Sequence, residues 1–160
     1  MIEVRGAEPG YEAHIRRVLS SLPAWYVQSA RVSRFVVNTS REVREQMAMY
    51  RHGTRDVLLA PAAGNLLQRA LAHELAHGCD DEGPANPHRW SRTPDWMGIW
   101  KTASTYEIPK YRDEPQEYFA DQLSKVVLLG AEKLQLSCPR ETQYMVRVVL
   151  PVLMAATNQR

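Results

Sequence analysis

Apolar residues recur every three or four positions in several stretches of this chain, as expected on one face of a helix. This spacing predicts helices over residues 11–22, 64–78, 114–129 and 139–158. The strongest pattern is in 64–78, where Leu67, Leu71 and Leu75 share a face. Pro115 suits the first turn of its helix, and Pro151 is expected to kink the last one.

The strand-like segments lie in the first sixty residues. Residues 31–39 are rich in β-branched side chains, and residues 48–60 predict two short strands joined by a turn near His52. Ser40 is placed to cap a short helix between them. Residues 79–113, with several prolines and tryptophans, predict a long connection that contains one short helix. Strands in one half and helices mostly in the other predict an α+β fold.

Length and composition narrow the class of protein. A chain of 160 residues, 44% hydrophobic and 24% charged, is typical of a single globular domain over 1–160. Two cysteines exclude a disulfide-rich scaffold and a four-cysteine zinc site, and a net charge of +2 gives no indication of a nucleic-acid partner. With charged residues early in the chain and no apolar run longer than 148–156, we expect no signal peptide and no membrane association. A cytoplasmic location follows, with signal-independent export and the oligomeric state left open.

One motif within the predicted helix 64–78 carries metal chemistry. His73-Glu74-Leu75-Ala76-His77 has the HExxH pattern. Residues four apart lie on one helix face, so both imidazoles can bind one Zn²⁺ ion. Glu74 is offset by one position, where its carboxylate can take a proton from a water that the zinc activates. The alternative is a chance match on a helix surface.

A catalytic zinc site needs a third protein ligand. Residues 78–83 do not continue the motif with the further histidine that some zinc enzymes use, so we expect the ligand on the next helix. Glu117 is the candidate ligand, and Asp121, one turn later, is placed to hold a ligating histidine from the second shell. The alternative is that both are solvated surface charges. Other candidates for the third ligand are Asp80, Asp81, His88 and Glu114.

HExxH followed by a glutamate and an aspartate on a second helix resembles the gluzincin zinc peptidases. The closer resemblance is to the catalytic domain of anthrax lethal factor and its relatives. It spans "AMYRHGTRDVLLAP", "ALAHELAHGCDD" and "YRDEPQEYFADQL", about half of the chain. Peptidases of the ImmA/IrrE type share a similar plan. The resemblance implies a zincin-like fold: a small N-terminal sheet with a hairpin and an edge strand, an active-site helix, a glutamate helix and a C-terminal helix.

The resemblance also implies a role for individual residues. His73, His77 and Glu117 would bind zinc, and Glu74 would act as general base and then general acid. Tyr111 would stabilise the oxyanion, although it lies six residues before Glu117 where the family pattern has seven. Tyr106 and His88 are the other candidates for that role, and a surface loop position is the alternative for Tyr111.

The same resemblance makes the strand 56–60 the edge strand that lines the cleft. An extended peptide can pair with such an edge. Trp90, Trp96 and Trp100 either shape a substrate pocket or fix a long loop to the core, and Cys79 is expected to be a buried thiol.

The sequence therefore predicts a zinc-dependent endopeptidase, a hydrolase of the bacterial or phage type, that acts on a protein or peptide substrate. The alternative function is a regulatory protein of peptidase-like fold that acts on, or binds, one specific partner such as a repressor. A third is a structural zinc site with a closed ligand shell. The intact Glu74 argues against the third, because a structural site needs no carboxylate there.

Overall fold

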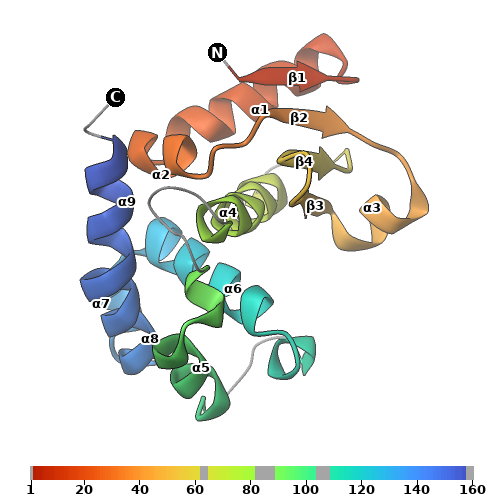
Figure 1. The fold of residues 1–160 in the computed structure, drawn as a ribbon. Coiled ribbons are helices and arrows are strands. Elements are labelled where there is room, and N and C mark those ends of the chain that lie inside the picture. The colour runs from red at the N-terminus through yellow and green to blue at the C-terminus, as the bar shows by residue number, and fades with distance from the viewer. Residues whose placement is uncertain (1, 62–64, 82–88, 104–108, 158–160) are drawn as a thin grey trace.

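The computed structural model describes residues 2–61, 65–81, 89–103 and 109–157. Over these residues the architecture is α+β, as the sequence predicts (Figure 1). The strands are β1 (Glu3–Arg5), β2 (Arg34–Val37), β3 (Ala48–Arg51) and β4 (Asp56–Leu59). The helices are α1 (Pro9–Ser21), α2 (Ala24–Ser29), α3 (Arg41–Gln46), α4 (Asn65–Asp80), α5 (Pro94–Lys101), α6 (Pro115–Leu129), α7 (Ala131–Leu134), α8 (Pro139–Tyr144) and α9 (Leu150–Thr157). Two 3₁₀ turns, η1 (Trp90–Arg92) and η2 (Pro109–Arg112), and a π-helical segment, η3 (Met145–Val149), complete the order.

The four strands form one mixed sheet in the order β1-β2-β4-β3. β1, β2 and β4 run parallel, and β3 pairs antiparallel with β4 as the predicted hairpin. The prediction that residues 56–60 form the edge strand is therefore wrong, because β4 has a neighbour on each side and β3 lies at the edge. All four residues of β4 are buried, which is typical of an internal strand covered on both faces.

Several local predictions are confirmed. α1, α4 and α6 lie within a few residues of their expected bounds, and the Oγ atom of Ser40 accepts a hydrogen bond from the backbone N–H of Val43 at the start of α3. β1 and α2 could not be predicted from the sequence, because three and six residues are too short to show a period. The expected helix 139–158 is divided into α8, η3 and α9. Pro151 cannot donate a backbone hydrogen bond, and the π-helical segment ends two residues before it, at Val149.

The central element of the core is α4, which lies between the sheet and the lower helices (Figure 1). Its apolar face, with Leu67, Leu71 and Leu75, is fully buried, and its most extensive contact is with α6. The long connection 79–113 is held to this core by its tryptophans, because Trp90 stacks on Phe119 and Trp96 packs edge-on against the same ring. Among the described residues, no helix has the length and apolar character needed to cross a membrane.

Gly78 allows α4 to approach α2 closely. A Cβ atom at this position would lie well inside contact distance of the carbonyl oxygen of Ala30, the residue that follows α2. Gly98, in the middle of α5, has no neighbour within 4 Å of the corresponding point. The two glycines therefore make a matched pair, in which both are helical and only Gly78 is crowded.

We expect Gly78→Ala to destabilise the fold by about 1–3 kcal/mol, because either the backbone of α2 or that of α4 must move. Gly98→Ala should be neutral or stabilising by up to about 1 kcal/mol, since alanine is the better helix former. Urea unfolding followed by circular dichroism measures both. Equal effects of the two substitutions would contradict the close approach of α4 and α2.

Candidate metal centre

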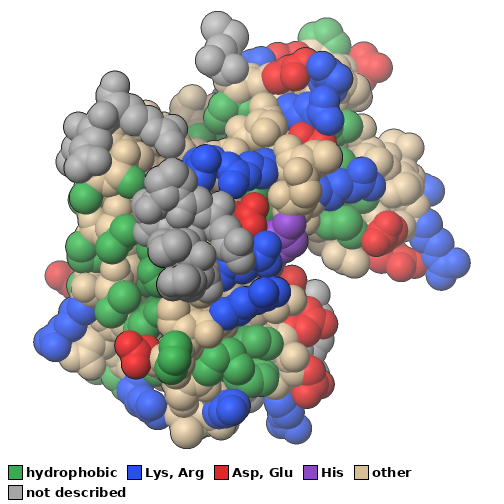
Figure 2. All heavy atoms as spheres, in the orientation of Figure 1, with side chains coloured by type: hydrophobic (Ala, Val, Ile, Leu, Met, Phe, Trp, Pro, Cys, Tyr) green, Lys and Arg blue, Asp and Glu red, His purple; other side chains and the backbone are tan. Residues whose placement is uncertain are grey.

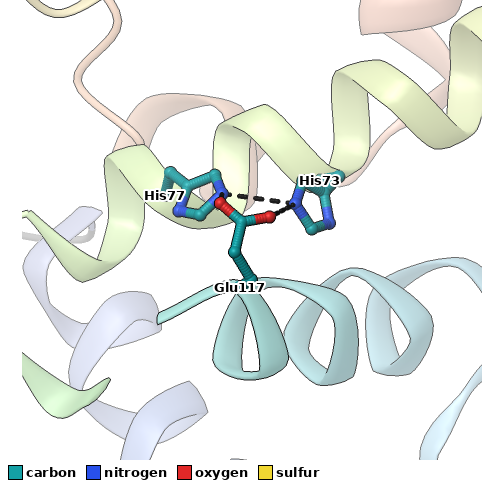
Figure 3. Close-up of side chains that lie close together, drawn as sticks. All are labelled: His73, His77 and Glu117. Atoms are coloured by element: carbon teal, nitrogen blue, oxygen red, sulfur yellow. Dashed lines mark hydrogen bonds and ion pairs between the residues drawn. The ribbon is translucent and has the colours of Figure 1, made fainter. Parts of the chain in front are cut away.

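Two helices bring the predicted ligands together. His73 and His77 lie one turn apart on the face of α4 opposite its buried leucines, and Glu117 lies in the first turn of α6. Figure 3 shows the carboxylate of Glu117 reaching from α6 toward both imidazoles on α4. Because α4 and α6 pack together along their length, residues 44 positions apart meet at one point. The structure therefore brings Glu117 next to the two histidines, as the sequence predicts.

The three side chains converge to within hydrogen-bond distances. The Nε2 atoms of His73 and His77 lie 3.2 Å apart, and the Nε2 of His73 lies 3.2 Å from Oε2 of Glu117. The Nε2 of His77 lies 3.3 Å from Oε1 of Glu117. Among the described residues these three form the one group of His, Cys, Asp or Glu side chains placed to hold a metal ion together. The cluster can therefore hold a metal ion.

The charges at this point also favour a cation. Burial alone raises the pKa of Glu117, but the hydrogen bonds from His73 and His77 hold that pKa well below its usual range, so the carboxylate is ionised. Burial lowers the pKa of His77, yet the hydrogen bond with Glu117 and the negative charge of Glu74 raise it overall. In the metal-free protein, a proton on His77 interacts with the carboxylate of Glu117. A metal ion bound between the two side chains would replace that proton and neutralise the same carboxylate.

A cleft of about 470 Å³ opens over the three ligands. Its walls are the edge strand β3 with the residues just before it, the ligand-bearing face of α4, and the facing side of α6. Figure 2 shows this face hollowed between the strand-bearing part and the lower helices, with a histidine at the inner end of the hollow. One side of the cluster is therefore accessible to a molecule bound in the cleft.

Glu74 and Tyr111 both line this cleft. Glu74 is 7% exposed and Tyr111 is 4% exposed. The ring of Tyr111 stacks beside that of His73, with centroids 6.3 Å apart, and the indole N–H of Trp100 donates to the Tyr111 carbonyl at 2.8 Å. Tyr111 is thus a buried tyrosine beside the metal cluster rather than a surface loop residue. Tyr106 and His88 lie outside the described residues.

Asp121 also lines the cleft, one turn after Glu117 on α6. Its carboxylate lies 2.8 Å from the Nζ of Lys125 and accepts a hydrogen bond of 3.2 Å from the side chain of Gln122. Asp121 and Glu117 are therefore not the solvated surface charges of the alternative interpretation. A second-shell role for Asp121 toward a histidine stays a prediction.

The structure places the other candidate ligands elsewhere. Asp80 is buried and accepts hydrogen bonds from the backbone and the hydroxyl of Ser91, and burial raises its pKa to about 6. Glu114 precedes α6, where its carbonyl accepts the first hydrogen bonds of that helix. Neither joins the three-residue cluster. Trp90, Trp96 and Trp100 pack against aromatic rings or the backbone, which fits the loop-fixing interpretation, and Cys79 is buried as expected.

Sequence reasoning missed one group beside the metal centre. His52, in the turn between β3 and β4, lines the cleft, and its ring lies edge-on to that of His77 with centroids 6.2 Å apart. Its Nδ1 lies 3.4 Å from Oδ1 of Asp81, the residue that follows α4. Burial and the charge of Arg89 lower the pKa of His52, so the ring is neutral at neutral pH. The sequence shows only that His52 lies in a predicted hairpin turn. It could be recognised as a candidate site residue only once the hairpin was known to border the HExxH helix.

In comparisons with known proteins, no family model and no curated protein sequence matches this chain. The resemblance to lethal factor-like peptidases consequently remains a prediction from the motifs.

The cluster predicts one bound divalent metal ion per chain. We expect His73→Ala and Glu117→Gln each to weaken metal affinity by roughly a hundredfold or more, since each removes one of three ligands. Elemental analysis and titration with Zn²⁺ measure this, with Glu132→Gln on the exposed surface of α7 as a control of equal charge change. Full metal content in Glu117→Gln would remove this residue from the ligand set.

The affinity for metal should also depend on pH. A metal ion requires neutral histidine ligands, and the pKa of His77 in the metal-free protein is raised above its ordinary value. As the pH falls through neutrality, protons compete for this nitrogen, so apparent affinity should drop by about tenfold per pH unit for each proton displaced. Zn²⁺ titrations between pH 5 and pH 8 test the sign. An affinity that is constant over this range would contradict histidine ligation.

Proposed function

We propose that this chain is a zinc-dependent endopeptidase that hydrolyses peptide bonds. The observation that carries the proposal is the convergence of His73, His77 and Glu117 at the base of a cleft, with Glu74 on the same helix lining that cleft. Three protein ligands with an accessible fourth side are typical of catalytic rather than structural zinc.

The chemistry of the donor set favours zinc over a harder cation. Two imidazoles and one carboxylate are donors that zinc accepts readily, whereas Mg²⁺ prefers oxygen ligands and water.

Each residue of the site has a distinct task in this proposal. When bound, zinc supplies a Lewis acid that polarises the peptide carbonyl and makes a water more acidic. Glu74 takes the proton of the attacking water and delivers it to the departing amine nitrogen. Tyr111, beside His73, donates a hydrogen bond from its hydroxyl to the carbonyl oxygen as negative charge develops there.

The edge strand β3 supports a peptide as the substrate. β3 pairs with β4 on one side, and its other side borders the cleft. An extended chain can add to such an edge through backbone hydrogen bonds, and side chains at alternate positions then reach the walls. Leu66, Ala70 and Leu128 supply apolar surface along these walls. We infer that the cleft takes an extended segment of a protein or peptide with an apolar side chain next to the cleaved bond.

The decisive variant is Glu74→Gln, which removes the base and preserves the size of the side chain and one accepting oxygen. We expect it to retain zinc while cleavage of a peptide library falls by roughly a hundred- to ten-thousandfold. Mass spectrometry of the digested library measures cleavage, and elemental analysis measures zinc in the same sample. Gln68→Glu on the same helix, away from the cleft lining, is a control for charge changes on α4. Cleavage by Glu74→Gln at the rate of the unaltered chain would refute the proposed mechanism.

A further inference from the structure

A second cluster of polar side chains lies beside the metal centre and is centred on Asp81. The carboxylate is 8% exposed and meets groups from two other parts of the chain. The hydroxyl of Tyr50 donates to Oδ2 at 3.2 Å, and the guanidinium of Arg89 donates to Oδ1 at 3.0 Å. Nδ1 of His52 lies 3.4 Å from Oδ1. Asp81 thereby ties the end of the edge strand and the following turn to the end of the metal-bearing helix.

This contact leaves the two nitrogens of His52 with different roles. Nδ1 faces a carboxylate, which accepts hydrogen bonds, and this contact favours the neutral tautomer with its proton on Nδ1. Nε2 then carries a lone pair and accepts hydrogen bonds. Within the described part of the chain, no group bonds to Nε2, although the side chain is 43% exposed and lines the cleft. One nitrogen faces the carboxylate of Asp81, and the ring lies at the wall of the cleft.

The position of His52 indicates what such a ligand would offer. The residue directly follows the last residue of β3, Arg51, so a chain paired with the edge of β3 continues toward the imidazole. The ring of His52 also lies against His77, whereas Tyr111 lies against the other histidine, His73. A peptide that crosses the metal centre therefore passes Tyr111 near one histidine ligand and His52 near the other. The hydrogen-bond donor that every peptide carries, except at proline, is its backbone N–H.

We propose that His52, oriented by Asp81, binds the substrate by accepting a hydrogen bond from one of its backbone N–H groups. The inference rests on the proposed peptidase function and adds a specificity rule to it. A substrate with proline, or with an N-methylated residue, at the position facing His52 lacks the N–H and binds less well. Asp81 acts as the positioning residue, because it selects the ring tautomer that accepts.

The test measures binding rather than cleavage. The probe is the peptide hydroxamate acetyl-Leu-Leu-NHOH, whose hydroxamate can bind the metal and whose leucines suit the apolar walls of the cleft. Its two analogues, each N-methylated at one leucine, remove one N–H at a time. Calorimetry gives the affinity of each compound for zinc-loaded wild-type protein, His52→Phe and His52→Gln. Zinc content and thermal midpoint are recorded for each variant, so that a general structural defect is visible.

We expect one of the two N-methylations to weaken binding to the wild type by roughly three- to tenfold, the usual value of one hydrogen bond. His52→Phe should weaken the parent compound by a similar factor and lose the sensitivity to that methylation. His52→Gln should recover part of the affinity, since its side-chain oxygen can accept near the position of Nε2. A wild type that ignores both methylations or fails to bind the probe, or a His52→Phe protein that keeps the wild-type pattern, would overturn the proposal.

Failure of the proposed function would be recognised separately. It would appear as an undigested peptide library with the zinc-loaded wild type, whereas the hydroxamate measurements require no turnover. A protein that binds the probe through His52 but cleaves nothing would retain the binding inference and lose the peptidase proposal.

Discussion

The packing of α4 against α6 is the constraint on which the candidate site depends. One helix supplies two histidines at a spacing of four residues, and this spacing alone places them on one face. The third ligand is fixed only when the first turn of α6 lies against that face. Two residues outside the site support this arrangement. Gly78 lets α4 approach Ala30, the residue after α2. The indole N–H of Trp96 donates to the carbonyl of Pro115 at the start of α6.

The sheet contributes to the site mainly through its edge. β4 is enclosed by its neighbours and carries buried side chains along its whole length, so it cannot receive a ligand. β3 is held on one side by β4 and at its end by the contacts of Tyr50 and His52 with Asp81. The same carboxylate that ends the metal-bearing helix thus sets the position of the strand opposite. The edge strand and the helix that carries the candidate metal ligands are consequently joined through one carboxylate.

Most of the local structure could be predicted from the sequence, because it depends on interactions close along the chain. The amphipathic helices, the capping of α3 by Ser40 and the hairpin all express a period or a cap that can be recognised directly. The order of the strands could not be predicted in this way. A short apolar strand such as β4 has the same pattern whether it is internal or at an edge, so the assignment of residues 56–60 to the edge was wrong. β1 and α2 are too short to show a pattern at all.

The residues of the candidate site likewise fall into those that could be predicted from the local sequence and those that could not. The pair His73 and His77 follows from spacing. The choice of Glu117 over the other acidic candidates depended on its place on the next predicted helix after the motif, and the tertiary geometry supports it. His52 and Asp81 lie 29 positions apart, from residue 52 to residue 81, and nothing in the local sequence of either residue indicates their contact. Contacts of this kind depend on where the hairpin lies relative to the helix, which is a property of the fold.

The separation of the ligands along the chain has a consequence for folding. His77 and Glu117 are 40 positions apart, from residue 77 to residue 117, and a metal ion held by both closes the intervening chain into a loop. An ion that binds the folded chain and not the unfolded chain stabilises the fold, by about 2.7 kcal/mol when free metal is a hundredfold above the dissociation constant. The metal ion would then act as a reversible staple between the HExxH helix and the C-terminal half of the protein. Supply of metal would regulate how long the folded chain persists as well as what it does.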